Sequence, residues 1–251
     1  MSLAEQYLER VTRILEEIAE KESAVIDKAA SIVAERVIHD RLIHVFGSGG
    51  HSIMGAMEVF WRAGGFANIN PLFPAGLSLI DSHPNIERTA GLAVPILKYY
   101  GVGQDDVLII INVNGINAIS IETALRANEM GAHVISITSP EFSKQVPAGI
   151  AARHASNKNL YELSEIVVDV HVPAGDSVLR LAGIDQTLGA TSTYAVCFAA
   201  NLIFIRTAEI LLANGFKPPI WTSANIQGGD EANSEYLSKY LNRVHHLYQM
   251  F

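Results

Sequence analysis

The sequence lacks most of the residues that carry redox, metal or nucleic-acid chemistry. It has one cysteine, Cys197, inside an apolar run, so no disulfide can form within the chain and we expect a small buried side chain rather than a nucleophile. No spacing of His and Cys is typical of metal ligands, so we expect neither a metal nor a cofactor. With 18 basic residues against 26 acidic ones and no basic stripe, the net charge of −8 argues against nucleic acid as a partner.

Targeting signals and long apolar runs are also missing. The first residues hold no basic segment followed by an apolar one, and no apolar stretch reaches the roughly 18 residues that a membrane span needs. We therefore expect a cytoplasmic protein with no membrane partner. A length of 251 residues with 49% apolar side chains suits one compact domain. Its expected parts are amino-terminal helices (1–40), a sheet core (41–213) and a carboxyl-terminal extension (214–251).

What the sequence does contain is an alternation of helical and strand-like segments. Apolar residues at helical spacing predict two helices ahead of the sheet, at 3–18 and 24–38. Runs rich in valine, isoleucine and leucine predict buried strands at 42–46, 66–69, 107–113, 133–137 and 166–172. Further helices are expected at 52–62, 87–100, 118–130, 189–213 and 231–248. This order indicates an α/β fold with a parallel sheet, and we expect surface excursions or short helices at 140–162 and 173–188.

Two glycine-bearing loops stand where a predicted strand gives way to a helix. The first lies in residues 45–52 (VFGSGGHS) and the second in residues 109–117 (IIINVNGIN). Loops that leave the carboxyl ends of parallel strands direct backbone N–H groups and a helix dipole at one spot, which favours a bound anion. Because no basic cluster is present, neutral donors and helix ends must hold that anion. The two loops together predict a phosphorylated small molecule as the ligand.

These loops, with a Ser/Thr cluster at 191–193 that opens the last long apolar helix, resemble the SIS family of sugar isomerase domains. The resemblance covers about residues 42–213. Within the family the chain is similar to uncharacterised bacterial SIS domain proteins, to phosphoheptose isomerases and to N-acetylmuramic acid 6-phosphate etherases. The resemblance implies a three-layer αβα fold with a five-stranded parallel sheet of flavodoxin-like type. It also implies a phosphosugar ligand and a homodimer or homotetramer.

The three elements supply the candidate substrate-binding residues. They are Gly47, Ser48, Gly49, Gly50, His51, Ser52, Asn112, Asn114, Gly115, Asn117, Thr191, Ser192 and Thr193. The hydroxyls can donate to phosphate oxygens or can instead cap helices, and the histidine has the same two alternatives. The second loop departs from the family pattern Ser-x-Ser-Gly-x-Thr/Ser, because its asparagines stand in place of hydroxyls. They would hold phosphate less deeply, bind sugar hydroxyls, or simply fit the turn at the glycine.

The same resemblance points to candidate catalytic residues. Aldose–ketose isomerisation needs a base that moves a proton between C1 and C2, and Glu87 stands where the etherases carry a glutamate. The alternative is that Glu87 complements a helix dipole. His83 is either a group for ring opening or a solvated loop residue. In an ungapped alignment Trp61 takes the position of the other etherase glutamate, and Glu58, one helical turn earlier, is the nearest acid.

Two functions are consistent with these residues. The chain is a phosphosugar isomerase or related lyase that uses Glu87 with His83 or Glu58, or it is a regulatory phosphosugar-binding protein that has lost its catalytic acids. Trp61 favours the second function, whereas the short segment that holds His83 and Glu87 favours the first. The position of Glu87 discriminates between them, because in an enzyme its carboxylate should approach the cleft between the two glycine loops. The zinc-assisted mechanism of phosphoheptose isomerases has no support in this sequence.

Overall fold

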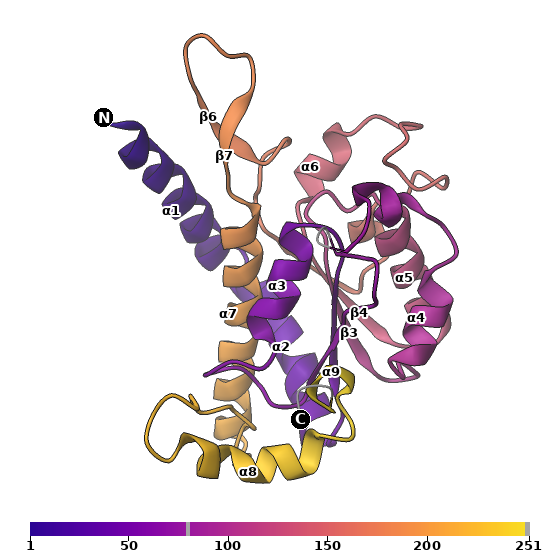
Figure 1. Cartoon of the computed structure of the whole chain (residues 1–251), viewed down its shortest axis with the longest axis vertical. Helices are drawn as coiled ribbons and strands as arrows, with labels where there is room; N and C mark the ends of the chain where they lie inside the picture. Colours follow the sequence, from indigo (N-terminus) through magenta and orange to yellow (C-terminus); the bar gives the residue numbers. More distant parts are fainter. Residues whose placement is uncertain (79–80, 249–251) are drawn as a thin grey trace.

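The computed structural model describes residues 1–78 and 81–248 and has a parallel sheet at its centre (Figure 1). Within these residues five strands form the sheet in the order β2-β1-β3-β4-β5. Their bounds are β1 Ile43–Gly47, β2 Ile69–Leu72, β3 Val107–Ile111, β4 His133–Thr138 and β5 Ile166–Asp169. All neighbouring strands are parallel. The loops that follow β1 and β3 therefore leave from the same edge of the sheet, here called the carboxyl edge; the opposite one is the amino edge.

Helices cover both faces of the sheet, so the fold has three layers. One face carries α1 (Leu3–Lys21), α2 (Ser23–Ile38), α3 (His51–Val59) and α7 (Ser192–Ala213). The other carries α4 (Ala93–Tyr99) and α5 (Ala118–Glu129). Successive strand residues point to opposite faces, so Val45 and Ile109 pack with the first group of helices and Phe46 and Ile110 with the second. The predicted αβα fold with a five-stranded parallel sheet is confirmed.

The helix α7 is the long apolar helix of the core. By length and composition its 22 residues could cross a membrane, so the expectation that no such stretch exists is wrong. In the structure it packs along α2 and α3, and Ile203 and Phe204 are buried there. A Cβ at Gly55 of α3 would lie 2.9 Å from Cγ2 of Val196, so glycine lets α3 and α7 approach closely at their amino-terminal halves.

The segment 173–188 is a β-hairpin rather than an irregular excursion. Its strands, β6 (Ser177–Arg180) and β7 (Thr187–Ala190), are antiparallel and project beyond the carboxyl edge beside α1 (Figure 1). The hairpin takes up residues 187–190, so the helix predicted from residue 189 begins only at Ser192. Alternation of apolar and polar residues is weak in these short strands, which left the hairpin without a clear pattern in the sequence.

Other predicted elements exist with different bounds. The predicted helix 87–100 is a 3₁₀ helix, η1 (Pro84–Arg88), followed by α4, and the predicted helix 231–248 divides into α8 (Gly229–Tyr240) and α9 (His245–Tyr248). The strand predicted at 66–69 is β2, which begins at residue 69. The segment 140–162 contains α6 (Pro140–Gln145) and a second 3₁₀ helix, η2 (Leu160–Glu162), in agreement with the expected short helices.

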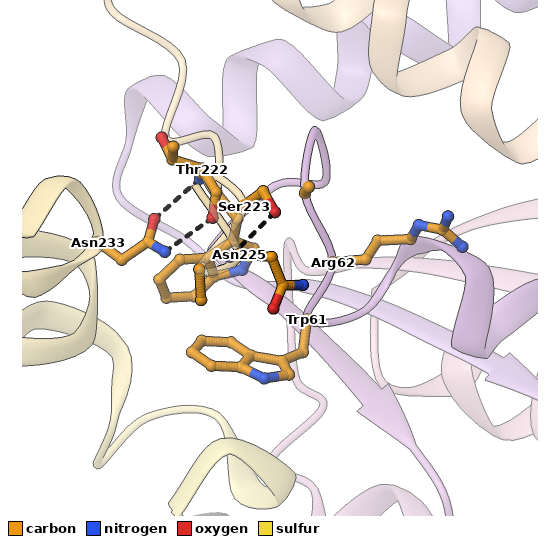
Figure 2. A pocket seen from close by; sticks show the side chains of 9 residues that line it. Trp61, Arg62, Thr222, Ser223, Asn225 and Asn233 are labelled. Carbon is orange, nitrogen blue, oxygen red and sulfur yellow. Dashed lines mark hydrogen bonds between the residues drawn. The ribbon is translucent and has the colours of Figure 1, made fainter. Parts of the chain in front are cut away.

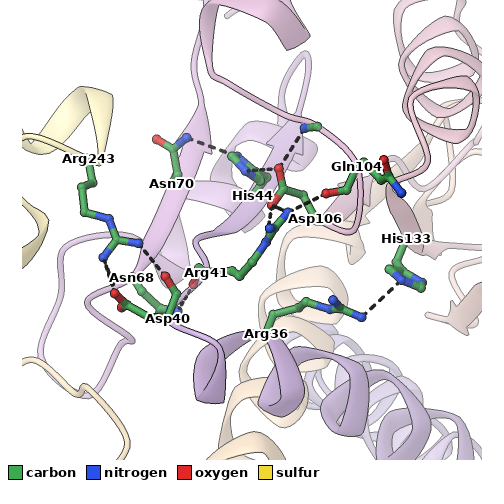
Figure 3. A network of polar contacts seen from close by, with 11 residues as sticks. Arg36, Asp40, Arg41, His44, Asn68, Asn70, Gln104, Asp106, His133 and Arg243 are labelled. Atoms are coloured by element: carbon green, nitrogen blue, oxygen red, sulfur yellow. Dashed lines mark hydrogen bonds and ion pairs between the residues drawn. The ribbon is translucent and has the colours of Figure 1, made fainter.

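A network of buried polar side chains lies at the amino edge (Figure 3), although Oδ1 of Asn68 and Nε of Arg36 have no hydrogen-bond partner among the described residues. The carboxylate of Asp106 accepts the amide of Gly103 at 2.8 Å, lies 2.8 Å from Nη2 of Arg41 and 3.6 Å from Nε2 of His44. Nδ1 of His44 in turn lies 3.2 Å from Nδ2 of Asn70. Burial alone would raise the pKa of Asp106, but the hydrogen bond and charge of His44, with Gly103 and Arg41, outweigh burial and lower it.

The same edge holds the carboxyl-terminal extension. Arg243 donates from Nη1 to both carboxylate oxygens of Asp40 at 3.1 Å, and Lys239 lies 2.8 Å from Oδ1 of the same carboxylate. The amide of His245 donates to Oδ1 of Asn70 at 3.2 Å. The extension therefore closes the amino edge, at the opposite end of the strands from the glycine loops.

Candidate functional site

The first glycine loop is a tight connection between β1 and α3. A Cβ at Gly47 would lie 2.1 Å from the carbonyl oxygen of Ser52, so only glycine fits where the strand meets the helix. Gly49 has φ of +78°, a conformation that glycine adopts without strain. The helix begins at His51 with Gly50 as its N-cap, so the amides of its first turn have no partner within the helix. These amides face outward from the carboxyl edge and can hold an anion.

Two buried polar atoms of this loop lack hydrogen-bond partners among the described residues. They are Oγ of Ser48, a residue only 2% exposed, and Nε2 of His51. A buried donor or acceptor without a partner costs about 1–3 kcal/mol, so natural structures keep few of them away from functional sites. Burial lowers the pKa of His51, and the negative charge of Asp176 opposes that shift in part. The loop thus has polar groups available to a ligand.

Glu87 directs its carboxylate at the same loop. A Cβ at Gly49 would lie 2.6 Å from Oε2 of Glu87, so the carboxylate lies directly against the bend of the loop. No described group donates a hydrogen bond to this carboxylate. Burial raises the pKa of Glu87, and the positive charge of Arg88 opposes the shift without cancelling it. A half-buried carboxyl with a raised pKa, next to an anion-binding loop, has the properties of a general base.

The asparagines of the second loop bind the loop itself. Oδ1 of Asn112 accepts the amide of Gly115 at 2.8 Å, and its Nδ2 donates to Oγ of Ser120 at 2.8 Å. Oδ1 of Asn114 accepts the amide of Ile116 at 3.2 Å. Such local bonds are typical of asparagine in turns. The alternative that these asparagines fit the turn is therefore the one that their contacts support.

The rest of the second loop packs on neighbouring loops. Nδ2 of Asn117 donates to the carbonyl of Ala152 at 3.2 Å. A Cβ at Gly115 would lie 2.8 Å from Oγ1 of Thr138 and 3.1 Å from Oγ of Ser143, so the bend packs on the loop after β4. Glu87 is placed against the first loop, and the structure gives no contact between it and the second.

At the start of α7 the predicted phosphate donors bind an internal carboxylate. Oδ1 of Asp176 accepts the amide of Ser192 at 2.7 Å and the amide of Thr191 at 2.9 Å. Oδ2 accepts Oγ of Ser192 at 2.6 Å, and Oγ1 of Thr191 lies 3.3 Å from Oδ1. Two of the three predicted hydroxyl donors, with their amides, are used in this way, while Thr193 makes no such bond. The aspartate completes the helix end that a phosphate was expected to bind.

Sequence reasoning missed Asp176 because it lies on a different element from the helix that it caps. An N-cap is expected directly before its helix, whereas this carboxylate comes 15 residues before Thr191, at the base of the hairpin. The one local signal is the pair Gly175-Asp176, typical of a turn; both residues have positive φ, +85° and +66°. That signal predicts a bend but not its partner.

The remaining catalytic candidates lie at different distances from the loop. His83 belongs to the segment of Glu87, and its Nδ1 accepts the amide of Asn85 at 3.1 Å, so it begins η1. Glu58 lies at the far end of α3, where it is paired with Arg62 and accepts Nδ2 of Asn201 at 3.2 Å. Two turns of helix separate it from the loop, so it does not join Glu87 there.

The predicted helix at 52–62, with Trp61 one turn after Glu58, is wrong at its carboxyl end. The helix α3 ends at Val59, not at residue 62, so Trp61 lies beyond it with φ of +46°. Its ring packs edge-on against Trp221 at a centroid distance of 4.5 Å. Both indoles, together with the loop 222–225, line a cavity of about 300 Å³ (Figure 2). Asn233 holds this loop through two hydrogen bonds of 2.8 Å to the backbone of Thr222. This cavity lies at the opposite end of α3 from the glycine loop.

Within residues 1–78 and 81–248, no group of three or more His, Cys, Asp or Glu side chains is arranged to hold a metal ion. The polar groups that meet at the first loop are instead backbone amides, a hydroxyl, an imidazole and a carboxylate. This set can bind a phosphate and transfer a proton without further groups.

Comparison with known proteins relates the chain to one domain family. A family model described as SIS domain matches residues 6–139. The chain is 36% identical to a UPF0309 protein of Halalkalibacterium halodurans over 239 residues, which cover 94% of this chain and 96% of the relative. It is 35% identical to a UPF0309 protein of Oceanobacillus iheyensis over 251 residues, which cover 98% of this chain and all of the relative.

Solved structures with a similar chain trace include two described as sugar isomerase proteins or domains. A phosphoheptose isomerase from Neisseria gonorrhoeae has a TM-score of 0.46 at 15% identity, over 83% of this chain and 98% of the other. The sugar isomerase domain of an RpiR transcription factor from Sphaerobacter thermophilus has a TM-score of 0.47 at 13% identity, over 97% of this chain and all of the other.

Proposed function

Since the chain belongs to the SIS domain family, we propose that it binds a sugar phosphate and acts as an aldose–ketose isomerase on it. The observation that carries this proposal is the contact between the carboxylate of Glu87 and the bend of the first glycine loop. An anion-binding loop and an unpaired carboxyl with a raised pKa are the two parts that the reaction needs. The whole chain acts as a single domain in this account.

The phosphate binds at the first loop. The amides of the first turn of α3 donate to its oxygens, and the loop glycines let the backbone approach closely. Oγ of Ser48 and Nε2 of His51 gain the partners that they lack within the protein. The second loop keeps its shape through its own asparagines.

Glu87 acts as the base at C1 and C2. It removes the proton from C2 of the open-chain aldose while O1 gains a proton, and an enediol forms. Return of a proton to C1, with loss of the proton from O2, gives the ketose. His83, four residues before Glu87 on the same segment, accepts the amide of Asn85 at Nδ1, and we propose its Nε2 as the group for ring opening.

We also propose a cytoplasmic homodimer or homotetramer. In α1, Leu3 and Leu8 are 46% and 67% exposed, and in the adjacent hairpin Ile184 and Leu188 are 47% and 44% exposed. Tyr7 joins the two elements by donating to the carbonyl of Ala190. An apolar surface of this kind, projecting from the body of the fold, favours burial against a second copy.

The second candidate function is a regulatory protein that binds a sugar phosphate without turnover. The ion pair of Glu58 with Arg62 favours this regulatory function, because it holds Glu58 far from the first loop. Among the described glutamates, Glu87 is then the one that lies against the loop. A lyase acting on lactyl ethers is a further variant of the enzyme.

A panel of sugar phosphates separates these functions. Ligands that raise the melting temperature are tested for turnover and for exchange of the C2 proton in deuterated water. Binding with exchange supports the isomerase, and binding without exchange supports the regulator. Ser48→Ala is the site control, because loss of its hydroxyl should weaken binding of any ligand whose phosphate occupies the first loop. Absence of binding across the panel would contradict both functions.

A further inference from the structure

Two carboxylates flank the first glycine loop, and no ion pair joins either of them to a cation. Glu87 lies against Gly49, and Asp176 lies at the amino terminus of α7. The ion pairs of the described residues include neither one. Their charges therefore act on whatever the loop binds.

The packing of α3 on α7 brings Asp176 to the first loop. Gly55 of α3 contacts Val196 of α7. One helical turn earlier, α3 begins at His51 and α7 begins at Ser192. Ser192 binds Asp176 through both its amide and its hydroxyl, and the charge of Asp176 acts on His51. The amino termini of α3 and α7 are therefore neighbours, one open to a ligand anion and the other already holding an internal one.

We infer that this arrangement selects sugar phosphates with a single anionic group. The ligand phosphate binds at the first loop, and the part of the ligand that extends toward Glu87 and Asp176 must be uncharged. A second phosphate or a carboxylate on the sugar would meet two fixed negative charges, and the donors at α7 that could compensate are used by Asp176. This inference rests on the proposed function and specifies its substrate class.

The cations near the site do not remove this restriction. Arg88 acts on Glu87, and it lines a cavity of about 370 Å³ together with Arg153 and His154. Arg153 donates to backbone carbonyls of its own loop and of α6, in the latter to Ser143 at 2.7 Å, and His154 lies 3.7 Å from a carboxylate oxygen of Glu122. These contacts belong to the loop after α6 and not to the start of α7.

The selection separates two reactions left open above. Sugars with a lactyl ether carry a carboxylate besides their phosphate, whereas aldose and ketose phosphates carry the phosphate alone. Two carboxylates without a cationic partner among the described residues disfavour the first class by repulsion and leave the second unaffected. The charge pattern of the site therefore favours isomerisation over ether cleavage.

The test compares three probes on the full-length protein by isothermal titration: fructose 6-phosphate, fructose 1,6-bisphosphate and 6-phosphogluconate. The other two probes carry a second anionic group, a phosphate or a carboxylate. The wild-type protein should bind fructose 6-phosphate about tenfold or more tightly than either of them, because the carboxylates of the site repel the second group at short range. Added salt should narrow the ratio, because it screens the repulsion. Asp176→Asn keeps one acceptor oxygen for the amides at the start of α7 and removes the charge, so the ratio should fall about threefold or more.

The control is Asp185→Asn, which removes the same charge from an exposed residue between the strands of the same hairpin and should leave the ratio unchanged. Equal binding of all three probes by the wild-type protein, or an unchanged ratio in Asp176→Asn, would overturn the inference and leave the proposed function intact. Binding of none of the probes would count against the proposed function itself. The wild-type ratio and its salt dependence still decide the matter if Asp176→Asn does not fold.

Discussion

Each edge of the sheet holds a histidine and a carboxylate, buried at the amino edge and half-buried at the carboxyl edge, but only at the amino edge do the two pair with each other. At the amino edge both nitrogens of His44 have partners, and Asp106 is bound by an amide, a guanidinium and that imidazole (Figure 3). At the carboxyl edge Nε2 of His51 has no partner, and Glu87 accepts no hydrogen bond from the described residues. The pKa of Asp106 is lowered, whereas that of Glu87 is raised.

This difference shows how burial alone fails to identify a functional site. A buried polar group that is fully paired contributes to the structure, because removal of any partner leaves an uncompensated charge. A buried polar group without a partner destabilises the protein, and at the first loop a bound phosphate would supply the partners that Ser48 and His51 lack. The following predictions test whether the two edges divide in this way.

The largest effect is expected from Glu87→Gln. The amide cannot accept the C2 proton, so kcat should fall about a thousandfold, within the range for removal of a general base. KM and the melting shift with ligand should change little, because the phosphate binds elsewhere on the loop. Steady-state kinetics and thermal shift measure these quantities. Retention of full turnover by Glu87→Gln would remove the proposed base.

The second effect concerns the bend at Gly49. In Gly49→Ala the new Cβ would displace the carboxylate of Glu87, and a misplacement of this size costs about a hundredfold in rate. The matched control is Gly76→Ala, which also has positive φ, +83°, but no neighbour within 4 Å. Both variants should lose about 1 kcal/mol of stability from backbone strain, and only the first should lose activity. Equal kinetics in the two variants would contradict the contact.

The third effect concerns the amino edge. Asp106→Ala leaves Arg41 and His44 without their carboxylate and should lower the free energy of unfolding by about 3 kcal/mol, as measured by urea denaturation. Ligand affinity of the folded protein should be unchanged. Loss of affinity at full stability would mean that the amino edge takes part in binding.

The smallest effect is a pH dependence that has opposite sign at the two edges. The folded state raises the pKa of Glu87, so the wild-type protein loses stability as pH rises through that pKa. Glu87→Gln should therefore be more stable than wild type at pH 7 but not at pH 4. The folded state lowers the pKa of Asp106, so its contribution is present above the unfolded pKa and is lost as pH falls through the folded one. Urea denaturation across this pH range measures both. Parallel pH profiles for Glu87→Gln and Asp106→Ala would contradict the distinction.

The sequence predicted the sheet well because its strands are buried on both faces and read as continuous apolar runs, as in Val107–Ile111. It placed the first loop correctly for the same reason, since Gly47 ends such a run. It could not predict that Asp176 would cap α7, because that contact joins residues on separate elements. The prediction that Glu58 and Trp61 are one turn apart on the same helix was wrong, because α3 ends at Val59. Trp61 lies beyond that end and packs against Trp221.

The most direct test of this account is a crystal structure of the protein with a sugar monophosphate that raises its melting temperature. We predict that the phosphate lies on the amides at the start of α3, within hydrogen-bond distance of Ser48 and His51. The carboxylate of Glu87 should then lie about 3 Å from the C1–C2 unit or its hydroxyls, the distance that proton transfer requires. A phosphate bound instead in the cavity lined by Arg88 and Arg153, or a Glu87 carboxylate turned away from the sugar, would contradict the central claim.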